Sequence, residues 1–158
     1  MIRSYIESDY ETLVSIANRA WAKIFEGYRK QMGDEIFDLI YSTPAQSKAN
    51  QIRKHVDTHP DDCLVAERNG KIVGFITFVC VKELGLGVIS NNAADPDSEE
   101  KGVGQEMYAA VFERFRAAGM RLAQVTTGLD EAHAPARKAY ERAGFQLHTE
   151  SITYYRKL

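Results

Sequence analysis

The fold of this chain is decided by the stretch from Asn91 to Gln105, which reads NNAADPDSEEKGVGQ. It contains the end of a β run, a turn with two glycines and the start of an amphipathic helix. The first amides of a helix have no partner within the helix, so they point at whatever lies beyond the preceding strand. The stretch therefore predicts an anion-binding site, where Gly102 and Gly104 let a phosphate approach the backbone.

This loop differs from two common phosphate-binding loops. It has neither the third glycine and early βαβ unit of a dinucleotide fingerprint nor the Gly-Lys-Ser/Thr of a P-loop. Taken alone, the pair of glycines is equally consistent with a simple turn before a helix. The interpretation therefore depends on the elements that flank the loop.

Before the loop, the pattern predicts one strand, three helical stretches and an antiparallel meander. Ser8 and Glu11 have the spacing of a capping box at the start of the first helix. Asn69-Gly70 is a strong two-residue hairpin signal. The predicted elements are a strand over 2–6, helices beginning near 8, over 34–40 and over 44–56, and strands over 63–67, 71–81 and 86–94.

After the loop, apolar residues recur at helical period and Gly119 ends the predicted helix. No repeat, linker or low-complexity run divides the chain, so we expect one mixed α/β domain over 1–158. The remaining predicted elements are a helix over 103–118, a strand over 122–127, a helix over 135–143 and two closing strands over 145–150 and 152–156.

The order of elements and two motifs resemble the GNAT superfamily of acyl-CoA-dependent N-acetyltransferases over nearly the whole chain. The motifs are the loop Glu99-x-x-Gly102-x-Gly104 and the helix His133-x-x-Ala136-x-x-x-Tyr140-Glu141-Arg142-x-Gly144-Phe145. The resemblance implies a mostly antiparallel, twisted central sheet, splayed between its fourth and fifth strands and flanked by helices. It also implies transfer of an acetyl group from acetyl-CoA to a primary amine of a small molecule or peptide, by direct attack in a ternary complex.

The resemblance also assigns roles to individual residues. The pantetheine arm would pair with the backbone near Asn92 and Ala94, as an added strand would. Tyr140 matches the family's general acid; a phenol with a pKa of about 10 keeps its proton at neutral pH, although Tyr140 could instead only pack in the core. The remaining implied cofactor-binding residues are Glu99, Glu100, Lys101, Gly102, Val103, Gly104, Gln105, His133 and Ala136.

The chain departs from the family pattern in three places. Glu99 and Glu100 stand where the family places Gln or Arg and Gly at the head of the loop, and they should weaken anion binding unless their side chains turn outward. His133 stands at the usual asparagine position. We expect the acidic loop to be offset by the basic helix, which carries Arg137, Lys138 and Arg142.

The sequence identifies neither the general base nor the acceptor substrate. The segment 84–94, which includes the central strand, contains no acid, so the proton would leave through water, Asp130 or Glu131, or the amine would arrive neutral. The acceptor site would involve the first two helices. There the sequence leaves open whether the clustered residues line a pocket or only pack: Trp21, Phe25, Tyr28 and Arg29.

Composition excludes several classes of protein. A formal charge of −2 over 158 residues and a pI of about 6.1 argue against nucleic-acid binding. Two cysteines without metal-site spacing predict neither a disulfide scaffold nor a bound metal. With no long apolar run, we expect a cytoplasmic protein without membrane contact. A homodimer stays open, and so does a non-catalytic acyl-CoA-binding or regulatory domain of the same fold.

Overall fold

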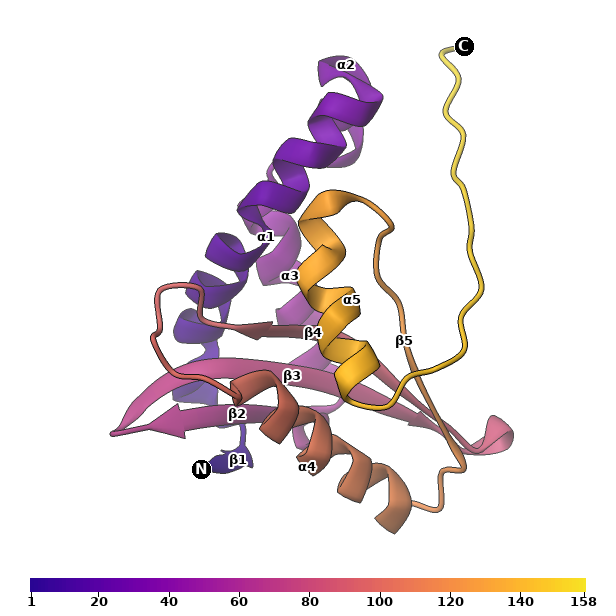
Figure 1. Ribbon diagram of the computed structural model, residues 1–158. Helices are drawn as coiled ribbons and strands as arrows, with labels where there is room; N and C mark the ends of the chain where they lie inside the picture. The colour runs from indigo at the N-terminus through magenta and orange to yellow at the C-terminus, as the bar shows by residue number, and fades with distance from the viewer.

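A five-stranded sheet runs through the protein in the order β1-β2-β3-β4-β5 (Figure 1). The computed structural model describes the backbone of residues 1–158 and every side chain except that of Ala45. The strands are β1 (Ile2–Ser4), β2 (Cys63–Arg68), β3 (Lys71–Val81), β4 (Leu86–Ala94) and β5 (Leu122–Val125). The helices are α1 (Tyr10–Met32), α2 (Asp34–Ile40), α3 (Pro44–Thr58), α4 (Val103–Ala117) and α5 (Ala134–Arg142), with short 3-10 turns at Glu7–Asp9, Pro60–Asp62, Lys82–Leu84 and Glu131–His133.

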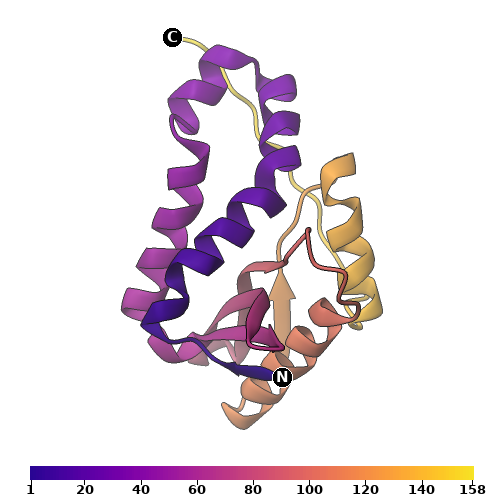
Figure 2. The ribbon, with the colours of Figure 1, turned by 90° about the vertical axis from the view of Figure 1, so that its left-hand side faces the viewer.

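Helices cover both faces of the sheet (Figure 2). On one face, α1 and α3 pack apolar residues such as Ile16 and Ile52 against Val65 and Phe75. On the other face, α4 and α5 close a second core that includes Met107. The sheet is antiparallel except for the β4–β5 pair, which is parallel. The predicted mixed α/β architecture is therefore confirmed.

The predicted hairpin between β2 and β3 is also confirmed. Asn69 and Gly70 have φ values of 49° and 74°, the left-handed backbone that a tight primed turn requires. A β-branched residue would be strained at either position. This turn sets the pairs Arg68–Lys71 and Glu67–Ile72, after which the register of β2 and β3 shifts by one residue between Glu67 and Ala66.

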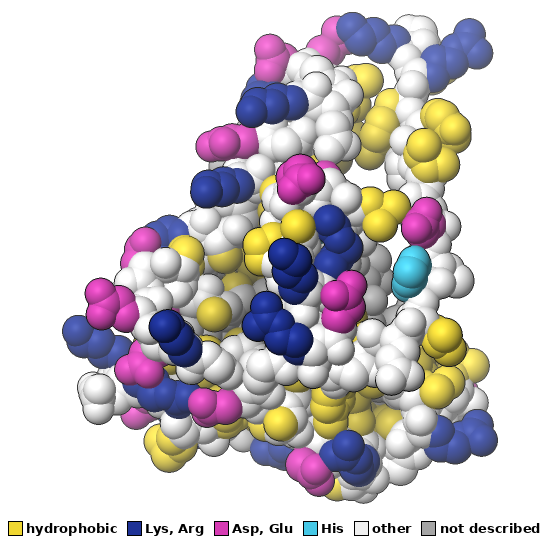
Figure 3. All heavy atoms as spheres, viewed as in Figure 1, with side chains coloured by type: hydrophobic (Ala, Val, Ile, Leu, Met, Phe, Trp, Pro, Cys, Tyr) yellow, Lys and Arg dark blue, Asp and Glu magenta, His cyan; other side chains and the backbone are white. Residues whose placement is uncertain are grey.

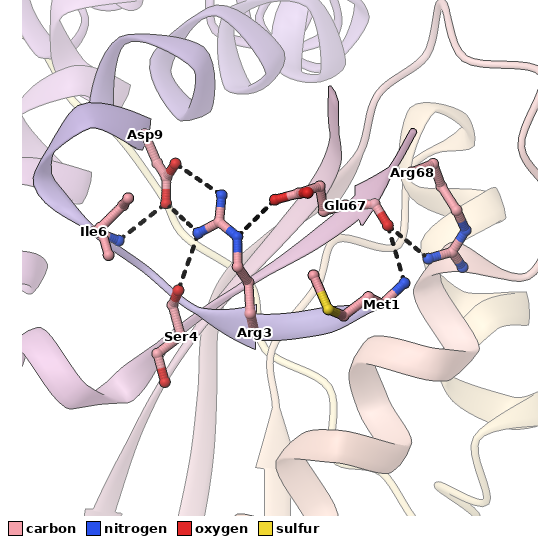
Figure 4. Close-up of polar contacts among 7 residues, drawn as sticks. All are labelled: Met1, Arg3, Ser4, Ile6, Asp9, Glu67 and Arg68. Carbon is pink, nitrogen blue, oxygen red and sulfur yellow. Dashed lines mark hydrogen bonds and ion pairs between the residues drawn. The ribbon is translucent and has the colours of Figure 1, made fainter. Parts of the chain in front are cut away.

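The start of the chain is held by an ion-pair cluster around Arg3 (Figure 4). Its guanidinium donates to Asp9 at 2.7 and 3.0 Å and to Glu67 of β2 at 2.7 Å. Asp9 also accepts the backbone N–H of Ile6. The predicted capping box is wrong: α1 begins at Tyr10, after a turn that contains Ser8, because the buried Asp9 carboxylate organises this corner.

A β-bulge in β4 causes the splay of the sheet. Ile76 lies opposite Asn92 and Phe78 opposite Ile89, so Thr77 of β3 faces two residues of β4. The buried Thr77 hydroxyl accepts the N–H of Asn91 at 2.9 Å and donates to its carbonyl at 3.2 Å. Bulges bend and twist the strand that carries them. Pairing of β4 with β5 accordingly ends at Ile89, and the sheet splays between its fourth and fifth strands.

The two predicted closing strands, over 145–150 and 152–156, are wrong. The chain after α5 is extended but unpaired, and in Figure 1 it runs past β5 toward α2, where Lys157 contacts Glu35. Apolar side chains along it are exposed, with Leu147 at 95%. A strand requires a hydrogen-bonding neighbour, and alternation in the sequence cannot supply one. In this structure the outer edge of β5 is therefore uncovered.

None of the described helices is long and apolar enough to cross a membrane. Within the same part of the chain, no three His, Cys, Asp or Glu side chains are grouped as metal ligands would be.

Candidate active site

Two adjacent residues of β4 point to opposite faces of the sheet at the splay. Asn92 faces α4 and α5, where it contacts Tyr108 and Tyr140. Asn91 faces α1 and α3, where it contacts Lys48. This is the period-two alternation of a strand. One strand therefore divides the site into two sides, which we call the tyrosine side and the lysine side.

On the tyrosine side, Asn92 holds two phenols in fixed positions. Its amide nitrogen donates to the Tyr140 hydroxyl at 3.2 Å, and its amide oxygen accepts the Tyr108 hydroxyl at 2.9 Å. The two rings lie 5.6 Å apart between centroids. Since Tyr140 accepts from Asn92, its own proton is available to a further acceptor.

Burial favours the protonated form of Tyr140. The side chain is in the core, with the residue 8% exposed, and this desolvation raises the pKa of the phenol despite an opposing contribution from the Asn92 hydrogen bond. Burial also raises the pKa of Tyr108. Both phenols are therefore neutral at physiological pH. The sequence left open whether Tyr140 packs or presents its hydroxyl, and in the structure it does both.

The helix start predicted to bind phosphate has the expected geometry. Gly102 precedes α4 with φ 80°, and no side chain caps the helix. The first intrahelical bond shown here is from the Glu106 N–H to the Gly102 carbonyl, so the amides of Val103, Gly104 and Gln105 have no acceptor within α4. The Gln105 side chain is used elsewhere, because it donates to the Ala139 carbonyl of α5 at 2.9 Å.

Gly104 has no structural need to be glycine. A Cβ there would lie 3.8 Å from the Tyr108 ring, an ordinary contact. Helix propensity favours alanine over glycine by about 1 kcal/mol at such a position. Packing among the described residues therefore does not require glycine at position 104.

Arginines from outside the loop meet its carboxylates. Arg19 of α1 lies 2.7 Å from Asp95 and 2.8 Å from Asp97. Arg68 of β2 lies 3.8 Å from Glu100 and 2.6 Å from Glu106. The ion pairs of the loop therefore come from α1 and β2, and the offset of the loop by α5 around a bound polyanion stays a prediction.

The basic helix α5 uses its charges differently. Arg137 donates to the carbonyls of Gly128 and Asp130, both at 2.7 Å. Figure 3 shows Lys and Arg side chains gathered over α5, which also carries the exposed Lys138 and Arg142. This leaves positive charge on the surface beside the start of α4.

The loop amides are not all equivalent. The Glu100 N–H donates to the Ser98 hydroxyl at 3.2 Å, so this amide has a partner already. The side chains of Glu99 and Lys101 are exposed. On β4, Asn92 and Ala94 pair with β3 on one edge, while β5 has diverged from the other. The structure thus brings the strand edge and the helix start to one end of the splay.

His133 is held by its neighbour Asp130. The Nδ1 of His133 donates to the Asp130 carboxylate at 2.6 Å, and the residue is 9% exposed. Burial raises the pKa of Asp130, but hydrogen bonds, chiefly from His133, outweigh it and the net shift is downward. A carboxylate with a lowered pKa is a weaker base, so this arrangement does not favour Asp130 as general base. Ala136 packs on the α4 side of the core.

Of the residues proposed for acceptor binding, Phe25 and Tyr28 stay in one aromatic cluster, with ring centroids 6.4 Å apart, whereas Trp21 contacts Lys48. Phe25 packs edge-on against Phe37 and Tyr41, in a cluster that joins α1 to α2. Arg29 pairs with acids of α2. Tyr28 lies 6.0 Å from the His133 ring, between centroids, and Trp21 lies against Lys48. Only Tyr28 and Trp21 therefore contact residues of the candidate site.

Sequence reasoning missed Lys48. It lies on α3 four positions before Ile52 and eight before Val56, both buried, so the helical period places it on the apolar face. A lysine on the buried stripe of an amphipathic helix was the available signal. Its ammonium reaches Asn91 at 3.0 Å, which joins α3 to β4.

Comparison with solved structures places the fold. PaiA N-acetyltransferase from Thermoplasma acidophilum, in complex with coenzyme A, matches with a TM-score of 0.70 and 16% identity over 96% of this chain and 92% of that one. An aminoglycoside acetyltransferase from an uncultured soil metagenomic sample, in complex with sisomicin, matches with a TM-score of 0.60 and 16% identity over 100% and 95%. A transcriptional regulator from Bacillus halodurans C-125 matches with a TM-score of 0.63 and 20% identity over 99% of each chain. The fold is that of GNAT acetyltransferases.

Sequence comparison identifies the family. The model of the acetyltransferase (GNAT) family matches residues 20–145, most of the chain, including β4, α4 and α5. No curated protein matches the sequence. The chain belongs to the GNAT acetyltransferase family, whose members use acetyl-CoA, and this supports acetyl transfer in general.

Proposed function

We propose that this protein is an N-acetyltransferase that moves an acetyl group from acetyl-CoA to a primary amine of a small molecule or peptide. The observation that carries the proposal is the Tyr140 hydroxyl, held by Asn92 at the point where β4 leaves β5. A phenol is placed there with a proton to give. The thioester supplies an activated acyl group when acetyl-CoA is bound.

The residues of this chain would bind the cofactor along two elements. Backbone groups at Asn92 and Ala94 offer the free edge of β4 to the pantetheine amides, as in strand addition. The amides of Val103, Gly104 and Gln105, with those of the preceding loop other than the Glu100 amide, would bind the pyrophosphate. The αL conformation of Gly102 and the absent Cβ of Gly104 fit such a ligand. His133, whose Nδ1 is held by Asp130, would offer its Nε2 to the cofactor, and Ala136 would lie beside the cofactor.

The chemistry then needs little more from the protein. A β4 N–H would polarise the acyl carbonyl, a contribution that commonly amounts to about 3 kcal/mol per donor. Tyr140 would give its proton to the departing sulfur, and direct attack by a neutral amine needs no covalent intermediate on the enzyme. With Asp130 committed to His133, water is the better candidate to accept the proton of the amine.

The test is release of free thiol from acetyl-CoA. The protein is mixed with acetyl-CoA and a panel of primary amines, and CoA thiol is measured beside acetyl-CoA affinity by calorimetry. Acceptor-dependent thiol release supports the enzyme. Tight binding without release across a broad panel would favour the non-catalytic acyl-CoA-binding or regulatory domain instead. No binding of acetyl-CoA would contradict both.

A homodimer stays a prediction. The outer edge of β5 and the apolar side chains of residues 145–158 are exposed, and Figure 3 shows apolar side chains along this segment. Light scattering across a concentration series measures the molar mass and tests the prediction directly. A mass of one chain at all concentrations would contradict it.

A further inference from the structure

Lys48 places a buried positive charge on the lysine side of β4. The residue is 9% exposed. Its ammonium donates to Asn91 Oδ1 and Gln51 Oε1, both at 3.0 Å, and lies 4.3 Å from the centroid of the Trp21 ring. All of these partners are neutral.

No carboxylate pairs with this ammonium among the residues that the structure describes. The arginines of the same two helices are paired: Arg19 with Asp95, Arg29 with Asp34, and Arg53 with Glu7. Burial of an ammonium without an anion is costly. Unlike these arginines, the buried Lys48 of α3 has no carboxylate partner among the described residues.

The contacts suit a cation better than a base. Amide oxygens and the face of an indole all attract a positive charge, and an ammonium has three N–H donors, of which two are used here. Burial lowers the pKa of Lys48 to about 8, so the ammonium form still predominates at neutral pH. Its third N–H has no hydrogen-bond acceptor among the described residues.

The position of Lys48 relates it to the proposed reaction. Its partner Asn91 directly precedes Asn92, which holds Tyr140 from the other face, and consecutive Cα atoms lie about 3.8 Å apart. Asn18 lies three positions before Trp21 on α1, a neighbour by helical spacing. Its Oδ1 is buried without a hydrogen-bond partner within the described residues. The lysine side thus offers a cation and an acceptor of N–H groups.

We propose that Lys48 binds a carboxylate of the acceptor, so that the acceptor is an amine that also carries a carboxylate group. This inference rests on the proposed function and adds the class of substrate. A carboxylate fits better than a phosphate because one ammonium with one available N–H matches a single negative charge, whereas phosphate sites gather several donors. Trp21 and Gln51 orient the ammonium.

The kinetic test compares amino acids with their carboxamides as acceptors. The carboxamide removes the charge and preserves shape. For the wild-type protein we expect kcat/KM to be about tenfold or more higher for the carboxylate. Lys48→Met, which keeps the length of the side chain, should lose this preference. Lys54→Met, an exposed lysine on the same helix, is the matched control and should keep it.

A second measurement does not depend on turnover or on the variant. N-acetyl amino acids and their amides, as product analogues, are added to wild-type protein with ¹³C-labelled lysine, and the Lys48 signal is followed by NMR. The missing signal in Lys48→Met identifies it. We expect the carboxylates, and not the amides, to shift this signal and raise the pKa of Lys48.

The outcomes separate the two proposals. If acetyl-CoA binds but no amine is acetylated, the proposed function fails, and the NMR measurement still decides the role of Lys48. If amides are acetylated as well as carboxylates and Lys48→Met slows both equally, the carboxylate proposal is overturned while the enzyme stands. No response of the Lys48 signal to any N-acetyl amino acid would overturn it as well.

Discussion

Asn91 and Asn92 are neighbouring residues of the same type, but they point to opposite sides of β4. The polar groups on these two sides differ in how many of them have a hydrogen-bond or charge partner. On the tyrosine side, both ends of the Asn92 amide are used and the two phenols are neutral. On the lysine side, Asn91 contacts a cation that no carboxylate pairs with among the described residues. A satisfied network fixes a geometry, whereas an uncompensated charge has a stability cost that a ligand can offset.

The largest expected effect comes from breaking the tyrosine side at Tyr140. Tyr140→Phe removes the proposed proton donor and leaves the ring in place, so kcat should fall about 10²-fold or more, as for loss of a general acid. Acetyl-CoA affinity, measured by calorimetry, should be unchanged. Tyr154→Phe, 85% exposed, is the control for loss of a phenol and should leave both quantities unchanged. Equal turnover of Tyr140→Phe and wild type would exclude Tyr140 from the chemistry.

On the lysine side, we expect Lys48 to make the stability of the protein depend on pH. The native pKa of Lys48 is about 8 against an ordinary value of 10.5. Between these values the unfolded chain binds the proton and the native chain does not, so this residue makes stability rise with pH. The rise amounts to at most about 3 kcal/mol.

Lys48→Met isolates this contribution. The difference in free energy of unfolding between wild type and variant, from urea titrations at pH 7 to 10.5, should change in favour of wild type as pH rises. Other groups titrate in both proteins and cancel. Lys54→Met should give a flat difference. A flat difference for Lys48→Met as well would mean that the ammonium is not desolvated.

A smaller effect is expected at the start of α4, which serves the tyrosine side. Gly104→Ala puts a methyl group where phosphate is proposed to approach, and acetyl-CoA affinity should fall about tenfold, the loss of one to two hydrogen bonds. Stability should not fall, since the Cβ meets only an ordinary contact at 3.8 Å. Gly27→Ala, in α1 with no atom within 4 Å, is the matched control and should alter stability alone. Equal acetyl-CoA affinity of the two variants would contradict binding of the pyrophosphate at the start of α4.

Features that depend on neighbouring residues could be predicted from the sequence, whereas contacts between distant residues could not. The loop from Asp95 to Gly104 and the position of β4 follow from local signals, namely turn glycines and periodicity, whereas Tyr140 was assigned from the resemblance to the GNAT family. The Arg19 and Arg68 ion pairs join residues distant in the chain, so no local pattern predicts them. The same is true of Lys48 and Asn91, 43 positions apart.

The prediction of the two closing strands was wrong because strand pairing also depends on residues distant in the chain. Alternation over 145–156 satisfies the local rule for a strand, but pairing is decided by which edge is within reach. In the structure Leu147 has no buried face to occupy. The hairpin at Asn69-Gly70 was predicted correctly because a two-residue turn brings the two strands that flank it side by side.

The smallest effect, and the sharpest test of the tyrosine side, comes from Tyr108→Phe. The Tyr108 hydroxyl donates to Asn92 and not to substrate in this scheme, so it acts as a positioning residue for Tyr140. Removal frees the Asn92 amide to turn, and we expect kcat to fall about threefold to tenfold, with a loss of about 1 kcal/mol in stability.

Positioning is distinguished from a purely structural role by a double-mutant cycle. If Tyr108 acts only through Tyr140, then adding Tyr108→Phe to Tyr140→Phe should lower stability again but leave kcat where Tyr140→Phe alone put it, because no proton donor remains to be oriented. Effects on kcat that multiply in the double variant would mean that Tyr108 contributes independently. In that case Asn92 would not be the link between the two phenols, and the tyrosine side would be two separate contacts with the strand.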